Sequence, residues 1–128
     1  MNFISPQLDI QSIKTTHTGS QCLYFKFKQK LTQEASKAGS QAWSQYMNEE
    51  AGSSFEFVWD CLEMTGFELQ ARKEWYNTIQ NHKNQIAKVY VVSDKLMIRS
   101  AAKVMLQFFG IPSKITRSDN ELPSSIHI

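Results

Sequence analysis

The feature that most constrains the fold is the segment Phe55–Arg72, where the apolar run FEFVWD ends on Asp60 and leads through CLEMTG into the helical pattern FELQARKEW. A run this dense in aromatic and apolar residues is not typical of an exposed strand and predicts one in the middle of a sheet. The amphipathic pattern that follows predicts a helix from Gly66 to about Lys83 that covers one face of that sheet. The segment therefore predicts a strand-to-helix junction of an α/β domain.

Polar and apolar residues alternate over residues 8–15 and 22–29, with THTGSQ between them. This pattern predicts two strands that form a hairpin. Thr32 is suited to cap a helix over residues 33–50, where alanines and aromatic residues recur at helical spacing. Gly39 lies inside that predicted helix and weakens it.

The second half of the chain repeats the strand-helix pattern. Residues 86–92, IAKVYVV, predict a further buried strand, and a helix is expected from Lys95 to Gly110. Residues 114–118 predict a last short strand. Residues 118–121 have the form of a capping box, but Pro123 limits a closing helix to about one turn.

The predicted order of elements is ββαβαβαβ, which indicates an α/β fold with a mixed central sheet of about five strands and helices packed on it. The final helix is expected to be short or absent. At 128 residues and 41% hydrophobic composition, the chain is expected to form a single domain over residues 1–128.

Charge and hydropathy exclude some classes of function. The net charge is +2 and the basic residues are dispersed, so nucleic-acid binding is not indicated. The sequence has no apolar run long enough to span a membrane and no signal peptide at its start, so we expect a cytoplasmic protein. Cys22 and Cys61 are predicted to be buried reduced thiols rather than a disulfide.

Motifs of cofactor binding or catalysis are absent from the sequence. His17, His82 and His127 lie in separate segments without Cys or carboxylate neighbours at ligand spacing, so no metal site is expected. There is no phosphate-binding loop, dinucleotide fingerprint or nucleophile elbow. We therefore expect neither a cofactor nor an enzyme of a known motif class.

The candidate binding site lies at the junction and at the end of the next strand. Ligands of open α/β sheets collect outside the carboxyl ends of strands, so polar residues at both places are expected to border one crevice. The candidate residues are Asp60, Glu63, Thr65, Gly66, Glu68, Arg72, Ser93 and Asp94. The structural alternative gives each of them an ordinary role: Thr65 as a helix cap, and Glu68 with Arg72 as a surface ion pair.

Two stretches carry a resemblance to a known family: F-x-F-V-W-D-C-L-E-M-T-G-F-E-L-Q-A-R and I-A-K-V-Y-V-V-S-D-K-L-M-I-R-S-A-A-K-V-M. Over roughly residues 8–122 the chain resembles the SpoIIAA-like branch of the STAS domains, also labelled STAS/SEC14. The resemblance implies a bacterial protein similar to anti-sigma factor antagonists, which have a D-S-S-G-like turn with a phosphorylated serine at the head of the second helix. The matching positions here are Glu68, Leu69 and Gln70, and the nearest hydroxyl is that of Thr65.

Three hypotheses for the function follow. The leading one is a non-enzymatic regulatory or protein-interaction module that lacks the serine phosphorylation switch and binds an unknown protein partner. The alternative is a domain that binds a small apolar or anionic ligand between the sheet and a helix. The third is an enzyme that uses Asp60 and Glu68 as acid and base. A homodimer is an open alternative for the oligomeric state.

The helix predicted from Lys95 to Gly110 has apolar residues around more than one side: Leu96, Met97, Ile98, Ala101, Val104, Met105, Phe108 and Phe109. We interpret this stripe as core, with an additional interface as the less favoured alternative.

Overall fold

The computed structural model describes residues 1–13, 21–123 and 126. Its strands are β1 (Asn2–Ile4), β2 (Leu8–Ile13), β3 (Gln21–Leu31), β4 (Phe55–Phe67), β5 (Ile86–Val92) and β6 (Ser113–Thr116). Its helices are α1 (Gln33–Glu49), α2 (Leu69–His82) and α3 (Leu96–Phe109), with single 3-10 turns η1 (Lys83–Gln85) and η2 (Asp119–Glu121). The mixed α/β fold is confirmed. The strand that was not predicted is β1, whose three residues are too few to show an alternating pattern.

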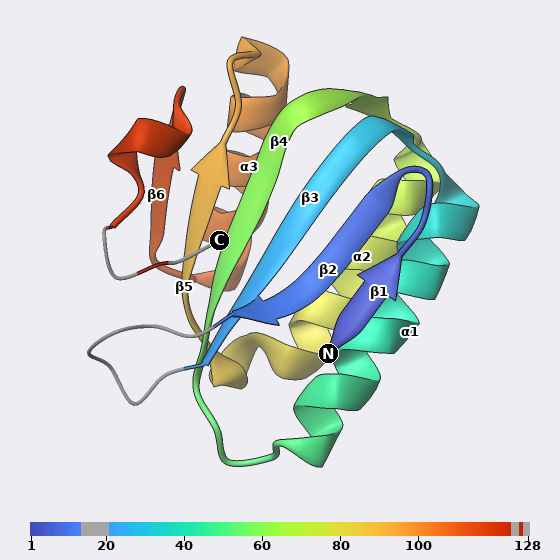
Figure 1. Ribbon diagram of the computed structural model, residues 1–128, viewed down its shortest axis with the longest axis vertical. Helices are drawn as coiled ribbons and strands as arrows, with labels where there is room; N and C mark the ends of the chain where they lie inside the picture. The colour runs from blue at the N-terminus through green and yellow to red at the C-terminus, as the bar shows by residue number, and fades with distance from the viewer. Residues whose placement is uncertain (14–20, 124–125, 127–128) are drawn as a thin grey trace.

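The strands lie side by side in their order along the chain. The β2–β3 pair is antiparallel, which confirms the predicted pairing, although most of the THTGSQ turn lies outside the described residues. From β3 to β6 the neighbouring strands are parallel and are joined through α1, α2 and α3. Because such crossovers are right-handed and each one moves to the next strand in the same direction, all three helices fall on one face of the sheet (Figure 1).

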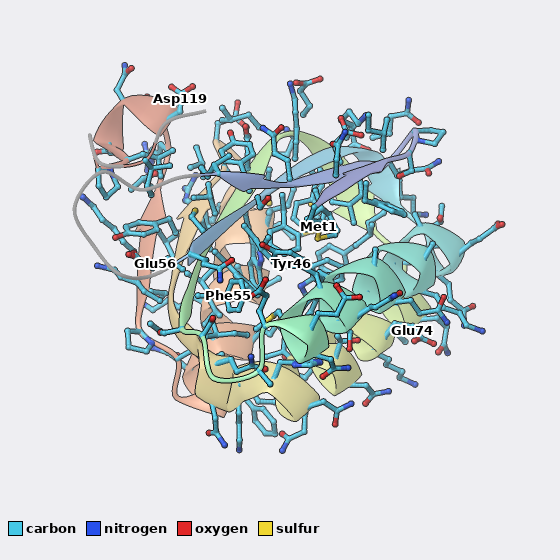
Figure 2. The ribbon with its side chains drawn as sticks, turned by 60° about the horizontal axis from the view of Figure 1, so that its bottom comes forward. Met1, Tyr46, Phe55, Glu56, Glu74 and Asp119 are labelled. Atoms are coloured by element: carbon cyan, nitrogen blue, oxygen red, sulfur yellow. The ribbon has the colours of Figure 1, made fainter. Side chains whose placement is uncertain are left out.

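The core lies between the sheet and the helices, as Figure 2 shows from the side. Large aromatic rings dominate it. The Phe25 and Phe57 rings from neighbouring strands have centroids 4.9 Å apart, and Trp43 of α1 lies 5.9 Å from Trp75 of α2. Both tryptophans are buried, so they pack helix to sheet.

Helix α1 begins as predicted, since the Thr32 hydroxyl accepts a hydrogen bond from the backbone N–H of Ala35. It lies close to β2 at Gly39, where an added Cβ would be 2.5 Å from Cδ2 of Leu8. A glycine at position 39 therefore permits the close approach of α1 to β2. This packing role explains a residue that, by helix propensity alone, only weakens the helix.

Helix α2 begins three residues later than predicted. The reason is that β4 continues its pairing with β3 as far as Leu31 and Phe67, so Gly66 lies in a strand. Helix α3 ends as predicted at Gly110, which has the left-handed φ of 68°. The predicted last strand and the one-turn closing helix correspond to β6 and η2.

The second face of the sheet faces the viewer in Figure 1, and none of the described α-helices lies on it. Part of this face is covered by the end of the chain, where Leu122 and Ile126 pack against a cluster of buried side chains. The cluster consists of Cys22, Tyr24, Val58 and Tyr90. We call the remaining part of this face, over β1 to β4, the open face.

Candidate functional site

The open face has a pocket of about 290 Å³ that is lined by two rows of cross-strand neighbours. Paired residues on neighbouring strands point to the same side of a sheet, so the strand register determines which side chains meet. One row consists of Ile4, Asp9, Lys26 and Asp60. The next consists of Asn2, Gln11 and Tyr24. The pocket is therefore built from the first four strands.

Asp60 forms the buried end of this pocket and is only 9% exposed. Its Oδ2 accepts a hydrogen bond of 2.5 Å from the Tyr24 hydroxyl, and its Oδ1 accepts one from the backbone N–H of Leu62. Burial and the bond to Asp60 raise the pKa of Tyr24 well above its usual range. The sequence predicted Asp60 at a strand end. In the structure it pairs with Val92 at the end of β5, but β4 itself continues beyond it.

The other charges around the pocket are paired. Lys26 Nζ lies 2.9 Å from Glu63 Oε2, and Lys28 Nζ lies 3.0 Å from Asp9 Oδ2. The bond to Glu63 raises the pKa of Lys26. Within the described ranges, Asp60 has no cationic side chain at ion-pair distance.

Thr65, Gly66 and Glu68 lie at the far end of β4. Thr65 is an exposed strand residue and does not cap α2, which corrects the structural alternative for it. Glu68 occupies the N-cap position of α2, but its carboxylate accepts a hydrogen bond of 2.6 Å from the backbone N–H of Gln33 at the start of α1. Glu68 therefore connects the starts of two helices and does not form the predicted ion pair with Arg72.

Ser93 and Asp94 hold the turn between β5 and α3. The buried Ser93 hydroxyl accepts from the backbone N–H of Lys95, and the Ser93 carbonyl accepts from Arg99 Nη1 at 2.9 Å. Asp94 is exposed and lies 3.4 Å from Lys95 Nζ. Neither residue lines the pocket on the open face. The structure thus does not bring the eight candidate residues together in one crevice.

A second pocket lies on the other side of the sheet, between α2 and α3. It is an apolar cavity of about 60 Å³. Its lining includes Phe27, Trp59, Met64, Trp75, Ile98 and Met105. Arg72 is the charged residue among its lining, and the Arg72 guanidinium lies 5.8 Å from the centre of the Tyr76 ring. Nε1 of Trp59, which also lines the cavity, has no hydrogen-bond acceptor in the described part of the chain.

Helix α3 exposes large apolar side chains beside this cavity. Leu96, Met97, Val104 and Phe108 are 70%, 62%, 61% and 71% exposed. Its buried residues are Ile98, Met105 and Leu106. The interpretation of the whole stripe as core was therefore wrong, because these four side chains stay mostly exposed, although the Phe108 ring lies 6.0 Å from the Tyr76 ring of α2.

The geometry gives little support to acid-base or thiol chemistry. Asp60 and Glu68 are eight residues apart along a strand, about 20 Å or more at the usual rise, which is too far for one acid-base pair. Both cysteines are free and buried, and burial raises the pKa of Cys22 to about 12. The ring nitrogens of His82 are within hydrogen-bond distance of Ser44 and Gln85, while His17 and His127 lie outside the described residues. In the described ranges, no group of three His, Cys, Asp or Glu side chains is arranged to hold a metal ion.

Sequence reasoning missed every pocket residue except Asp60, namely Asn2, Ile4, Asp9, Gln11, Tyr24 and Lys26. Residue type alone did not mark them, because each is ordinary in a strand. The alternation in LYFKF was the available signal, since it places Tyr24 and Lys26 on one side of the strand and the phenylalanines on the other.

No family model and no curated protein sequence matches this chain. One similar solved structure is that of an uncharacterized protein of the DUF3478 family with a SpoIIAA-like fold from Shewanella loihica, at a TM-score of 0.71 and 16% identity over 94% of both chains. Another is the unphosphorylated form of the anti-sigma factor antagonist SpoIIAA, at a TM-score of 0.51 and 8% identity over 82% of this chain and 86% of that one. No helix in the described part of the chain is long and apolar enough to cross a membrane. From these two similarities the chain has a SpoIIAA-like fold, which confirms the fold that the sequence resemblance implied.

Proposed function

We propose that this chain is a cytoplasmic, non-enzymatic STAS-type regulatory module that binds a protein partner through the exposed side of α3. The observation that carries the proposal is the set of four large apolar side chains on α3 that are 61–71% exposed. Exposed apolar groups gathered on one element mark protein-interaction sites more often than isolated ones do. One of the similar structures is an anti-sigma factor antagonist, which supports a regulatory role.

The module works without the serine phosphorylation switch. Helix α2 begins at Leu69, so Leu69 and Gln70 occupy its first two positions, and neither has a hydroxyl. Leu69 is also 58% exposed. This helix start therefore has an exposed apolar side chain where the anti-sigma factor antagonists that the sequence resembles have a phosphorylated serine. Thr65 lies in β4 and not at the helix start. Binding is therefore not controlled by a phosphate at this turn.

The test is affinity capture from a lysate of the source organism with the wild-type chain and with a Met97→Ser, Phe108→Ser double variant. A matched control is Gln107→Ser, an exposed polar residue of the same helix. The same protein should be enriched by wild type and control and lost with the double variant, and its purified form should bind the double variant about tenfold or more weakly. Equal enrichment by wild type and double variant would contradict the proposal.

The apolar cavity favours a second candidate function, the binding of a small ligand with an apolar body and an anionic head. Arg72 is the charged residue among its lining, and the Nε1–H of Trp59, which also lines it, has no acceptor among the described residues. Native mass spectrometry of freshly purified protein should then show an additional mass that is reduced in Arg72→Gln. A bare polypeptide mass in wild type would exclude a ligand retained through purification.

A further inference from the structure

We propose that the pocket on the open face is a second binding site, in which Asp60 binds the ammonium group of a small polar amine. The site is independent of the surface on α3, because the two lie on opposite sides of the sheet. Trp59 and Asp60 are consecutive residues of β4, so their side chains point to opposite faces of the sheet. Trp59 lines the cavity on the face that the helices cover, and Asp60 lines the pocket on the open face.

The first argument is the charge of Asp60. A carboxylate that is 9% exposed is costly to bury unless a cation or several donors compensate it. Each oxygen of Asp60 accepts one hydrogen bond, from Tyr24 and from Leu62, and each therefore retains capacity for another donor. A cationic group in the pocket would supply both the missing countercharge and the missing donors.

The second argument is the charge balance of the lining. Lys26 and Asp9 also line the pocket, but each is already paired with an oppositely charged residue at about the length of a hydrogen bond. These two pairs leave Asp60 as the net charge of the pocket. A cation is therefore favoured over an anion, even though a lysine is present.

The third argument is the space and the remaining polar groups. The pocket volume of about 290 Å³ exceeds that of an ammonium ion and suits a molecule with a short polar chain. Asn2 and Gln11 are exposed cross-strand neighbours whose amides offer donors and acceptors to hydroxyl or amine groups of such a chain. A metal ion is a poorer occupant, because the described residues offer no cluster of three ligand side chains.

A purely structural role for Asp60 would be to accept the hydrogen bonds of the Tyr24 hydroxyl and of the Leu62 backbone N–H. An uncharged asparagine can accept from Leu62 through its oxygen and donate to the phenol oxygen through its amide, at a lower desolvation cost, so this role does not require a carboxylate. The two roles therefore predict different results for Asp60→Asn. Its stability should change little under either, but only the binding role predicts a loss of amine binding.

The experiment is a titration of the ¹⁵N-labelled chain with 1,4-diaminobutane, followed by backbone amide shifts, with butane-1,4-diol as the uncharged control. The diamine should cause saturable shifts at Tyr24, Lys26 and Leu62 with a dissociation constant on the order of 1 mM, as expected for so small a ligand. The diol should cause none. Asp60→Asn should weaken binding by about tenfold or more, whereas Asp94→Asn, which removes an exposed carboxylate elsewhere, should leave it unchanged.

A second variant protects the test against misfolding of Asp60→Asn. Gln11→Lys changes an exposed residue and places an ammonium group within the lining, so it should abolish diamine binding while Asp60 stays in place. The proposal is overturned by the absence of saturable shifts in wild type. It is equally overturned by undiminished binding in either pocket variant, since that result would indicate unspecific attraction to the surface.

Discussion

Replacing Gly39 with alanine should change the free energy of unfolding in opposite directions, depending on the residue at position 8. In the wild-type chain the new Cβ would lie 2.5 Å from Cδ2 of Leu8. Leu8 is the first residue of β2 and is fully buried, so its side chain has little room to move away from α1. In Leu8→Val this terminal methyl group is missing, and the nearest remaining atoms in the structure are Ile10 Cδ1 and Leu8 Cγ, both at 3.7 Å, an ordinary van der Waals distance.

Two opposing free energies decide the sign. An alanine inside a helix is favoured over glycine by about 1 kcal/mol. Forcing an additional carbon into a packed core costs about 1–3 kcal/mol. Gly39→Ala should therefore destabilise the wild-type chain by about 0–2 kcal/mol and stabilise the Leu8→Val chain by about 1 kcal/mol. The coupling between the two positions should be about 1–3 kcal/mol.

The assay is urea unfolding, followed by tryptophan fluorescence, of the four chains of this double-mutant cycle. Ala38→Gly is the matched control, because residue 38 is exposed one position earlier in the same helix and measures helix propensity alone. It should cost about 1 kcal/mol. If Gly39→Ala stabilises both backgrounds equally, the close approach to Leu8 does not limit this position and the reasoning is refuted.

Two further predictions concern pH and a helix start. The pKa values of Tyr24 and Cys22 are raised by burial, that of Cys22 from 9.0 to about 12, so the folded chain holds protons that the unfolded chain releases. The contribution of these two groups to the free energy of unfolding should therefore be constant below about pH 8 and fall as pH rises through about 9–12. The fall above about pH 10 should be smaller in Tyr24→Phe, and an equal fall in that variant would contradict the assignment to Tyr24. Glu68→Ala should lower the unfolding free energy by about 0.5–1 kcal/mol, because the backbone N–H of Gln33 loses its acceptor. Glu68→Gln should lower it less, because an acceptor oxygen remains. Equal losses in urea unfolding would assign the effect to charge instead.

Most helices and strands could be predicted from the sequence, because their signals are local. Thr32 caps α1 through its own side chain, and Gly110 ends α3 in the left-handed conformation that glycine adopts easily. The end of β4 could not be predicted, because it depends on pairing with β3, a strand more than twenty residues earlier in the chain. Residues that look like the start of a helix, such as Gly66, are strand residues for this reason.

The candidate site was predicted in part. Asp60 was identified as an unusual residue, because a carboxylate ends an apolar run. Its surroundings were not predicted, because they come from the register of four strands and not from its neighbours in sequence. Glu68 shows the same limit, since its hydrogen-bond partner Gln33 is 35 residues away and no local pattern distinguishes that contact from an ion pair with Arg72.

The uncovered face of the sheet follows from strand order, which periodicity does not give. With strands in sequence order, every crossover places its helix on the same side, so the residues that point to the other side meet either the end of the chain or solvent. Their chemistry agrees with this division. Cys22, Val58 and Tyr90 lie under the end of the chain, whereas Gln11 and Lys26 lie in the uncovered part.

Asp60 and its hydrogen-bond donor Tyr24 depart from this division, because both are buried yet line the uncovered pocket, and of the two only Asp60 is a carboxylate. The apolar run of β4 hides this exception in the sequence, since its alternate residues face two different environments. A buried charged side chain on an uncovered part of a sheet is the most informative position at which to test for a bound ligand. Asp60 meets this condition, whereas Glu63, three residues later on the same strand, is exposed and already paired with Lys26.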